Sequence, residues 1–148
     1  HELYHSDRIV TNGADAVTFT IRKEYREEFY SLLEMVQEHL LCKIERKRIA
    51  IECNPSSNYR IGEMTRYDEH PILKFYNHGL STPYKSHSIA VSINTDDQGV
   101  FATSLEREYS LMALAIERFQ PEGTENSPRQ ILEWLDRIRV MSVEQQFE

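Results

Sequence analysis

Residues 89–97 read Ile-Ala-Val-Ser-Ile-Asn-Thr-Asp-Asp, a short apolar run with β-branched side chains that ends in two adjacent carboxylates. A similar run at residues 49–53, Ile-Ala-Ile-Glu-Cys, is followed by the turn-forming residues Asn-Pro-Ser-Ser-Asn at 54–58. Nearly continuous apolar runs of this length are typical of strands that are buried in a parallel sheet. The sequence therefore predicts two parallel strands, at residues 49–53 and 89–93, and a turn at residues 54–58.

Helices are predicted where apolar residues recur at three- and four-residue spacing. They cover about residues 22–42, 70–77, 105–119 and 127–140. The order of helix, strand, helix, strand, helix and helix predicts an α/β fold with a parallel sheet. Two buried parallel strands do not form a stable sheet alone, so the chain is short of strands for its own pattern. We therefore expect residues 1–148 to form a single partial domain.

The composition is that of an ordinary globular domain, with 148 residues, of which 40% are hydrophobic and 28% are charged. The net charge of −7 argues against a dedicated nucleic-acid-binding protein. No apolar run approaches the roughly 18–20 residues that a membrane helix needs. Two cysteines, Cys42 and Cys53, are too few for a disulfide-stapled secreted scaffold and are predicted to be buried thiols. We expect a cytoplasmic chain, or a piece of something larger, that binds neither membranes nor nucleic acid.

The candidate functional residues that the pattern itself provides are Asp96 and Asp97. Loops that come after parallel strands converge on one edge of the sheet, and functional groups gather there. Two adjacent carboxylates repel each other unless a cation or hydrogen-bond donors compensate them, and carboxylate oxygens are zinc ligands. The same pair is equally compatible with a plain turn or with a helix N-cap before Gly99.

Four ordered segments between residues 49 and 110 carry a family signature. They are Ile51–Asn58, His70-Pro71-Ile72 with Phe75 and Gly79, Ser92–Asp97, and Phe101–Tyr109. These segments resemble motifs of the adenosine and AMP deaminase superfamily. In that order, they are similar to its Glu-x-Cys-Pro-x-Ser-Asn strand, its His-Pro helix, its last strand ending in Asn-Thr-Asp-Asp, and its Phe-x-Thr-x-Leu-x-x-Glu-Tyr helix start.

The resemblance implies a (β/α)8 barrel in which a zinc-activated water attacks C6 of a purine and releases ammonia. This chain would then be the last two βα units and the closing helices of such a barrel. Asp96 would be a zinc ligand, Asp97 would bind a purine ring nitrogen, and Ser57 and Asn58 would lie in the substrate-binding loop at the pocket mouth. The implied substrate is a purine nucleoside or nucleotide. The implied partner is the rest of the barrel or another chain, and unpaired strand edges favour an oligomer.

The remainder of the family's site is missing from this sequence. It has no His-x-His pair and no glutamate in a His-Ala-Gly-Glu-like context, so we expect no catalytic residue in this segment. His39 is predicted on a helix surface, His70 and His78 beside a short helix, and His87 in a polar loop. Gln98 replaces the Pro that usually comes after the paired aspartates, which suggests a divergent branch such as the larger bacterial deaminase-like proteins.

The sequence supports three interpretations of function. The first is a segment of a zinc-dependent purine deaminase that, as an isolated chain, binds zinc weakly and is inactive. The second is a catalytically inactive deaminase-like module for binding or assembly. The third is a free-standing small α/β protein that uses Asp96 and Asp97 to bind Mg²⁺. The first two are distinguished by whether the missing motifs stand before His1.

Overall fold

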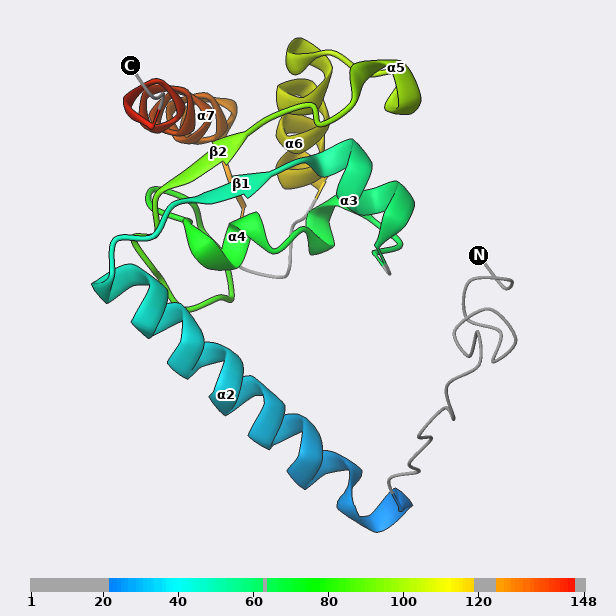
Figure 1. The fold of residues 1–148 in the computed structure, drawn as a ribbon. Helices are drawn as coiled ribbons and strands as arrows, with labels where there is room; N and C mark the ends of the chain where they lie inside the picture. Colours follow the sequence, from blue (N-terminus) through cyan, green and yellow to red (C-terminus); the bar gives the residue numbers. More distant parts are fainter. Residues whose placement is uncertain (1–21, 63, 119–124, 146–148) are drawn as a thin grey trace. The chain divides into compact units, whose positions relative to one another are not determined.

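The structure, a computed structural model, describes residues 22–62, 64–118 and 125–145 (Figure 1). The chain divides into two compact units, residues 1–36 and 37–148, and each is described by itself. Among the described helices we find none with the length and the apolar character that a membrane-crossing helix requires. All the predicted site residues belong to the second unit.

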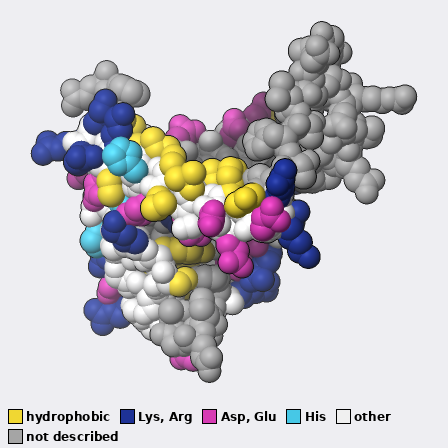
Figure 2. Space-filling model, turned by 90° about the horizontal axis from the view of Figure 1, so that it is seen from below, with side chains coloured by type: hydrophobic (Ala, Val, Ile, Leu, Met, Phe, Trp, Pro, Cys, Tyr) yellow, Lys and Arg dark blue, Asp and Glu magenta, His cyan; other side chains and the backbone are white. Residues whose placement is uncertain are grey.

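A short 3₁₀ helix, η1 (Lys23–Tyr25), leads into the long helix α2 (Arg26–Arg46). The predicted helix is confirmed, and it extends one turn beyond residue 42. Lys43 and Arg46 lie in its last turn, where cations stabilise the negative end of a helix. Figure 2 views the molecule from below relative to Figure 1, and hydrophobic side chains, drawn in yellow, are exposed on that face. Large apolar side chains of α2 are exposed at Tyr30, Leu32, Leu33, Met35, Val36 and Leu40.

The second unit contains a two-stranded sheet in which β1 (Ile51–Cys53) and β2 (Val91–Ile93) are parallel. The register pairs Ile51 with Val91 and Cys53 with Ile93. All three residues of β2 are buried, as the apolar run predicts. Both predicted strands and their parallel arrangement are confirmed, although each strand is shorter than its apolar run. The fold is a mostly helical α/β arrangement with a small parallel sheet, compatible with part of a (β/α)8 barrel.

Two long helices, α6 (Leu105–Arg118) and α7 (Pro128–Glu144), pack against β2 and against each other (Figure 1). Ser127 and Gln130 form a capping box at the start of α7, which satisfies backbone N–H groups there. Trp134 is fully buried, and its indole Nε1 donates a hydrogen bond of 3.0 Å to the Tyr76 carbonyl. These contacts give the second unit one hydrophobic core, built from Cys53, Ile72, Leu73, Ile89, Val91, Ile93, Met112, Ile116, Ile131, Trp134, Leu135 and Ile138.

The turn predicted at residues 54–58 is wrong, because this segment begins helix α3 (Pro55–Ile61). Pro55 stands at the first helical position, where a missing N–H costs nothing and the fixed φ favours the helix. The helix predicted at residues 70–77 is shorter than expected. It is reduced to α4 (Ile72–Phe75), because Tyr76 is extended and forms an antiparallel bridge with Ser88. A 3₁₀ helix, η2 (Tyr67–Glu69), precedes it.

Candidate functional site

The carboxyl ends of β1 and β2 lie side by side. Cys53 pairs with Ile93, and the Asn94 N–H donates a hydrogen bond of 2.9 Å to the Cys53 carbonyl. The register therefore places the start of α3 next to the segment that comes after β2. This is the edge at which α/β proteins carry their functional groups.

Ser57 and Asp96 are in direct contact at this edge. The Ser57 hydroxyl donates a hydrogen bond of 2.7 Å to Asp96 Oδ2, and Ser57 is buried whereas Asp96 is exposed. Asp96 has a φ of 54°, in the left-handed region that non-glycine residues rarely adopt. Backbone strain of this kind persists only where surrounding structure enforces it, and it gathers at functional sites.

Asn58 is held by His70, which comes directly after η2. Asn58 Oδ1 accepts hydrogen bonds from the Asn54 N–H (3.1 Å) and from His70 Nε2 (3.0 Å). The Ile72 N–H donates to His70 Nδ1 at 3.2 Å, so the proton of the neutral ring is on Nε2. Burial lowers the pKa of His70 to about 4, against an opposing effect of the nearby Glu108. His70 is therefore a neutral donor that fixes the Asn58 side chain.

Asp97 performs the helix-capping role that the sequence left open. It is the N-cap of the short helix α5 (Gln98–Phe101), and its Oδ1 accepts a hydrogen bond of 2.9 Å from the Val100 N–H. One of the two carboxylate oxygens of Asp97 is thus used to start the helix. Capping fixes the direction of this side chain beside Asp96.

Glu108 supports the site, and no role for it was predicted from the sequence. This fully buried carboxylate on α6 accepts a hydrogen bond of 2.8 Å from the Ser56 N–H and a further bond from the Thr103 hydroxyl. It therefore connects the first turn of α3 to α6 and holds Ser57 in place. The signal in the sequence that could have pointed to Glu108 was the Glu-Tyr pair at the end of the Phe101–Tyr109 segment, which resembles a family motif.

A cavity of about 460 Å³ opens beside these residues. Its lining includes Ser57, Asn58 and His70 together with apolar residues such as Phe75, but neither Asp96 nor Asp97. A largely apolar cavity of a few hundred Å³ with a few fixed polar groups is the usual form of a small-molecule site. The cavity is lined by the predicted substrate-binding pair, Ser57 and Asn58.

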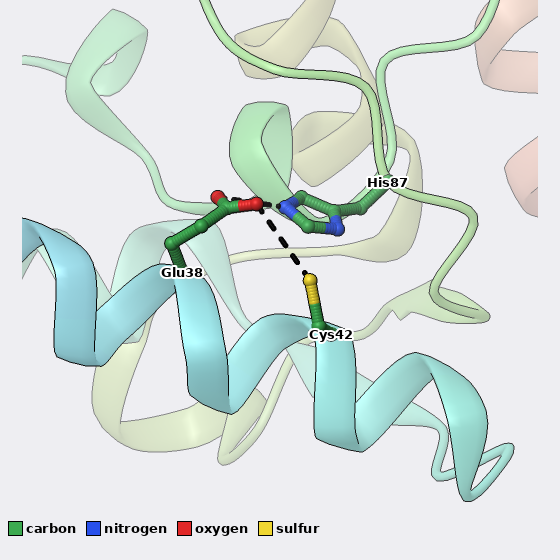
Figure 3. A group of neighbouring side chains, drawn as sticks. All are labelled: Glu38, Cys42 and His87. Carbon is green, nitrogen blue, oxygen red and sulfur yellow. Dashed lines mark hydrogen bonds and ion pairs between the residues drawn. The ribbon is translucent and has the colours of Figure 1, made fainter.

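One group of three metal-ligating side chains occurs among the residues that the structure describes, and it includes neither Asp96 nor Asp97. It consists of Glu38, Cys42 and His87 (Figure 3). His87 lies in a loop, as predicted, but its ring is buried and only 2% exposed. Cys42 is half-buried, whereas Cys53 is buried as predicted, and burial raises the pKa of the Cys53 thiol to about 12. His39 is exposed on α2, as predicted.

Comparison with known proteins identifies the family. A family model described as adenosine deaminase matches residues 30–131, more than half of the chain. The chain belongs to the adenosine deaminase family. No solved structure matches it significantly.

Curated relatives match over part of the chain. An adenosine deaminase of Plasmodium gallinaceum is 36% identical over 77 residues, which are 52% of this chain and 19% of the relative. An aminodeoxyfutalosine deaminase of Streptomyces coelicolor is 35% identical over 74 residues, or 50% of this chain and 17% of that protein. The chain therefore matches less than a fifth of the length of these relatives.

Proposed function

We propose that this chain supplies the last two βα units and the closing helices of a (β/α)8 barrel in a zinc-dependent purine deaminase. The observation that carries the proposal is the Ser57–Asp96 hydrogen bond of 2.7 Å at the carboxyl ends of two parallel strands. It joins residues from two separate family motifs at the edge where barrel enzymes hold their active sites. Residues 1–148 are then one partial domain of that barrel.

The unpaired surfaces of the chain support the barrel. A two-stranded parallel sheet is not stable alone, and each strand here has an outer edge that another strand can pair with. Several large apolar side chains of α2, including Leu32 and Leu40, are exposed. The rest of the barrel, or another chain in an oligomer, would cover both surfaces.

In the proposed site Asp96 is the zinc ligand of the last strand. The residue fits the role, because its carboxylate is exposed and its orientation is fixed by the Ser57 hydroxyl. Partners that orient a ligating carboxylate in this way are a regular part of metal sites. Asp96 belongs to no group of three possible ligands within the described residues, so the remaining ligands would come from other parts of the protein. Zinc, when bound, lowers the pKa of a coordinated water to near neutrality.

The neighbouring residues bind the base. Asp97 binds a purine ring nitrogen and is aimed by its capping bond to Val100. Ser57 and Asn58 form the side of the pocket, and the His70 bond stops the Asn58 amide from rotating. The substrate class is a purine nucleoside or nucleotide. A reducing compartment such as the cytoplasm suits the two free thiols.

An inactive deaminase-like module is the second candidate. It is favoured by the single ligand that Asp96 contributes and by the capping role that already occupies Asp97. The two functions differ in whether the full-length protein turns over a purine.

The test is ammonia release by the full-length protein from adenosine, adenosine monophosphate and aminodeoxyfutalosine. We expect turnover of at least one of them, and a loss of more than about 100-fold in Asp96→Asn because a metal ligand is removed. Asp136→Asn is the matched control, since Asp136 is an exposed aspartate on α7 paired with Arg139. Turnover that persists in Asp96→Asn contradicts the assignment, and no turnover of any purine favours the inactive module. Deamination by the isolated 148-residue chain would also contradict the proposal.

A further inference from the structure

The group of metal-ligating side chains formed by Glu38, Cys42 and His87 lies at the opposite end of β2 from Asp96. Glu38 and Cys42 are four residues apart on α2 and therefore project from the same face of the helix. His87 comes from the segment that precedes β2, and Figure 3 shows its ring lying against these two side chains. One ligand atom of each residue lies within 4.8 Å of those of the other two.

The distances between these atoms approach those of a zinc site. Zinc binds sulfur at about 2.3 Å and nitrogen or oxygen at about 2.0–2.2 Å, which sets tetrahedral ligand separations of about 3.3–3.6 Å. His87 Nε2 is 3.1 Å from Glu38 Oε2, and Cys42 Sγ is 3.7 Å from Glu38 Oε1. Each of these two separations is close to the required value, the first for one oxygen of Glu38 and the second for the other.

The surroundings of His87 match those of a metal-ligating histidine. Its Nδ1 is 3.5 Å from Glu45 Oε2, while Nε2 faces Glu38. The Ser88 N–H donates a hydrogen bond of 2.8 Å to the other oxygen of Glu45 and so fixes that carboxylate. A histidine that ligates a metal through one nitrogen usually donates its other N–H to a carboxylate, which sets the tautomer and the ring orientation.

The Lys85 ammonium would compete with a metal ion for the Glu38 carboxylate. This ammonium, which is largely exposed, forms an ion pair with Glu38 Oε1, the oxygen that also accepts from the Cys42 thiol. A metal ion bound there displaces the ammonium and the thiol proton, which leave to solvent.

We propose that Glu38, Cys42 and His87 form a zinc site, with Glu45 orienting the histidine and a water molecule as the fourth ligand. The site connects α2 to the segment before β2 and is separate from Asp96. Its ligand set of one thiolate, one imidazole and one carboxylate is a zinc set. The proposal is independent of the deaminase assignment.

The test is a Co²⁺ titration of chelator-treated full-length protein in an Asp96→Asn background, which removes the contribution of the other site. Cobalt reports a thiolate ligand through a charge-transfer absorption band. We expect this band on titration, its loss in Cys42→Ser, and about tenfold or more weaker binding in Glu38→Gln. Glu34→Gln, one turn earlier on α2 and exposed, is the matched control and should bind normally.

Lys85→Ala gives a second, independent readout. Removal of the competing ammonium should strengthen Co²⁺ and Zn²⁺ binding several-fold. If the Lys85–Glu38 ion pair had only a structural role, its removal would not strengthen metal binding. Circular dichroism of each variant confirms that the protein is folded. Absence of the charge-transfer band in folded protein, or unchanged binding in Cys42→Ser, overturns the proposal.

Discussion

The Ser57 hydroxyl donates a hydrogen bond of 2.7 Å to Asp96 Oδ2, although 39 positions separate the two residues in the chain. The parallel register of β1 and β2 creates this contact, since it places the start of α3 beside the residues that come after Ile93. Ser57 thus fixes the orientation of an exposed carboxylate whose backbone is held in a left-handed conformation. The arrangement is suited to holding a ligand at the sheet edge.

Ser57→Ala removes the group that orients Asp96. In the full-length protein we expect kcat/KM for the proposed purine substrate to fall about 10–100-fold, with weaker metal binding, because a partner of the proposed ligating carboxylate is lost. Steady-state kinetics and metal analysis measure the two effects. Ser110→Ala is the control, since the Ser110 hydroxyl bonds only its own helix at Glu106 O among its described contacts. Unchanged kinetics in Ser57→Ala would contradict the role of the hydroxyl.

Glu108→Ala leaves the buried Ser56 N–H without its acceptor and creates a cavity beside α3. We expect the free energy of unfolding to fall by about 2–3 kcal/mol, measured by urea denaturation. Glu106→Ala, on the exposed side of the same helix, should change stability far less. Equal effects of the two variants would show that the buried carboxylate does not support the site.

The buried His70 predicts a pH dependence of stability. Its folded pKa of about 4 lies below the ordinary value of 6.5, so the unfolded chain binds the proton more strongly between these values. The stabilisation is complete above pH 6.5 and is lost as the pH falls towards 4, by about 3 kcal/mol at most. Denaturation across this range should show the slope in the natural protein and a smaller one in His70→Gln.

Gly79 has a φ of 86°, and a Cβ added there would lie 2.6 Å from Arg137 Nη1, which donates to the His78 carbonyl. Gly79→Ala should therefore lower the free energy of unfolding by about 1–2 kcal/mol through left-handed strain and a displaced arginine. In Gly99→Ala the new Cβ meets only Asp97 Oδ1, at 3.3 Å. A melting temperature that falls no further in Gly79→Ala than in Gly99→Ala would contradict this account.

Local pattern predicted the elements that are buried or strongly periodic. The apolar runs predicted both strands, and the three- and four-residue spacing predicted the helices at α2, α6 and α7. Residues 54–58 were misassigned because Asn, Pro and Ser favour both turns and helix starts, and tertiary contacts decide between the two. Here the buried Glu108 carboxylate accepts from the Ser56 N–H and so stabilises the helix start.

The sites differ in how far the sequence could reveal them. The motifs predicted that Ser57 and Asp96 lie at one edge of the sheet, and the structure brings them into contact, although Ser57 lies in helix α3 and not in the predicted turn. Their proposed roles stay predictions. The cluster of Glu38, Cys42 and His87 left no signal in residue spacing, because more than 40 residues separate His87 from α2 and only tertiary packing joins them.

The most direct measurement is anomalous scattering at the zinc edge from crystals of the full-length protein. We predict a peak about 2.0–2.2 Å from an Asp96 carboxylate oxygen, the ordinary zinc–oxygen distance. The Ser57 hydroxyl should still be bonded to that carboxylate. Zinc-loaded, active protein with no peak at Asp96 would contradict the central claim that Asp96 is a metal ligand of a purine deaminase.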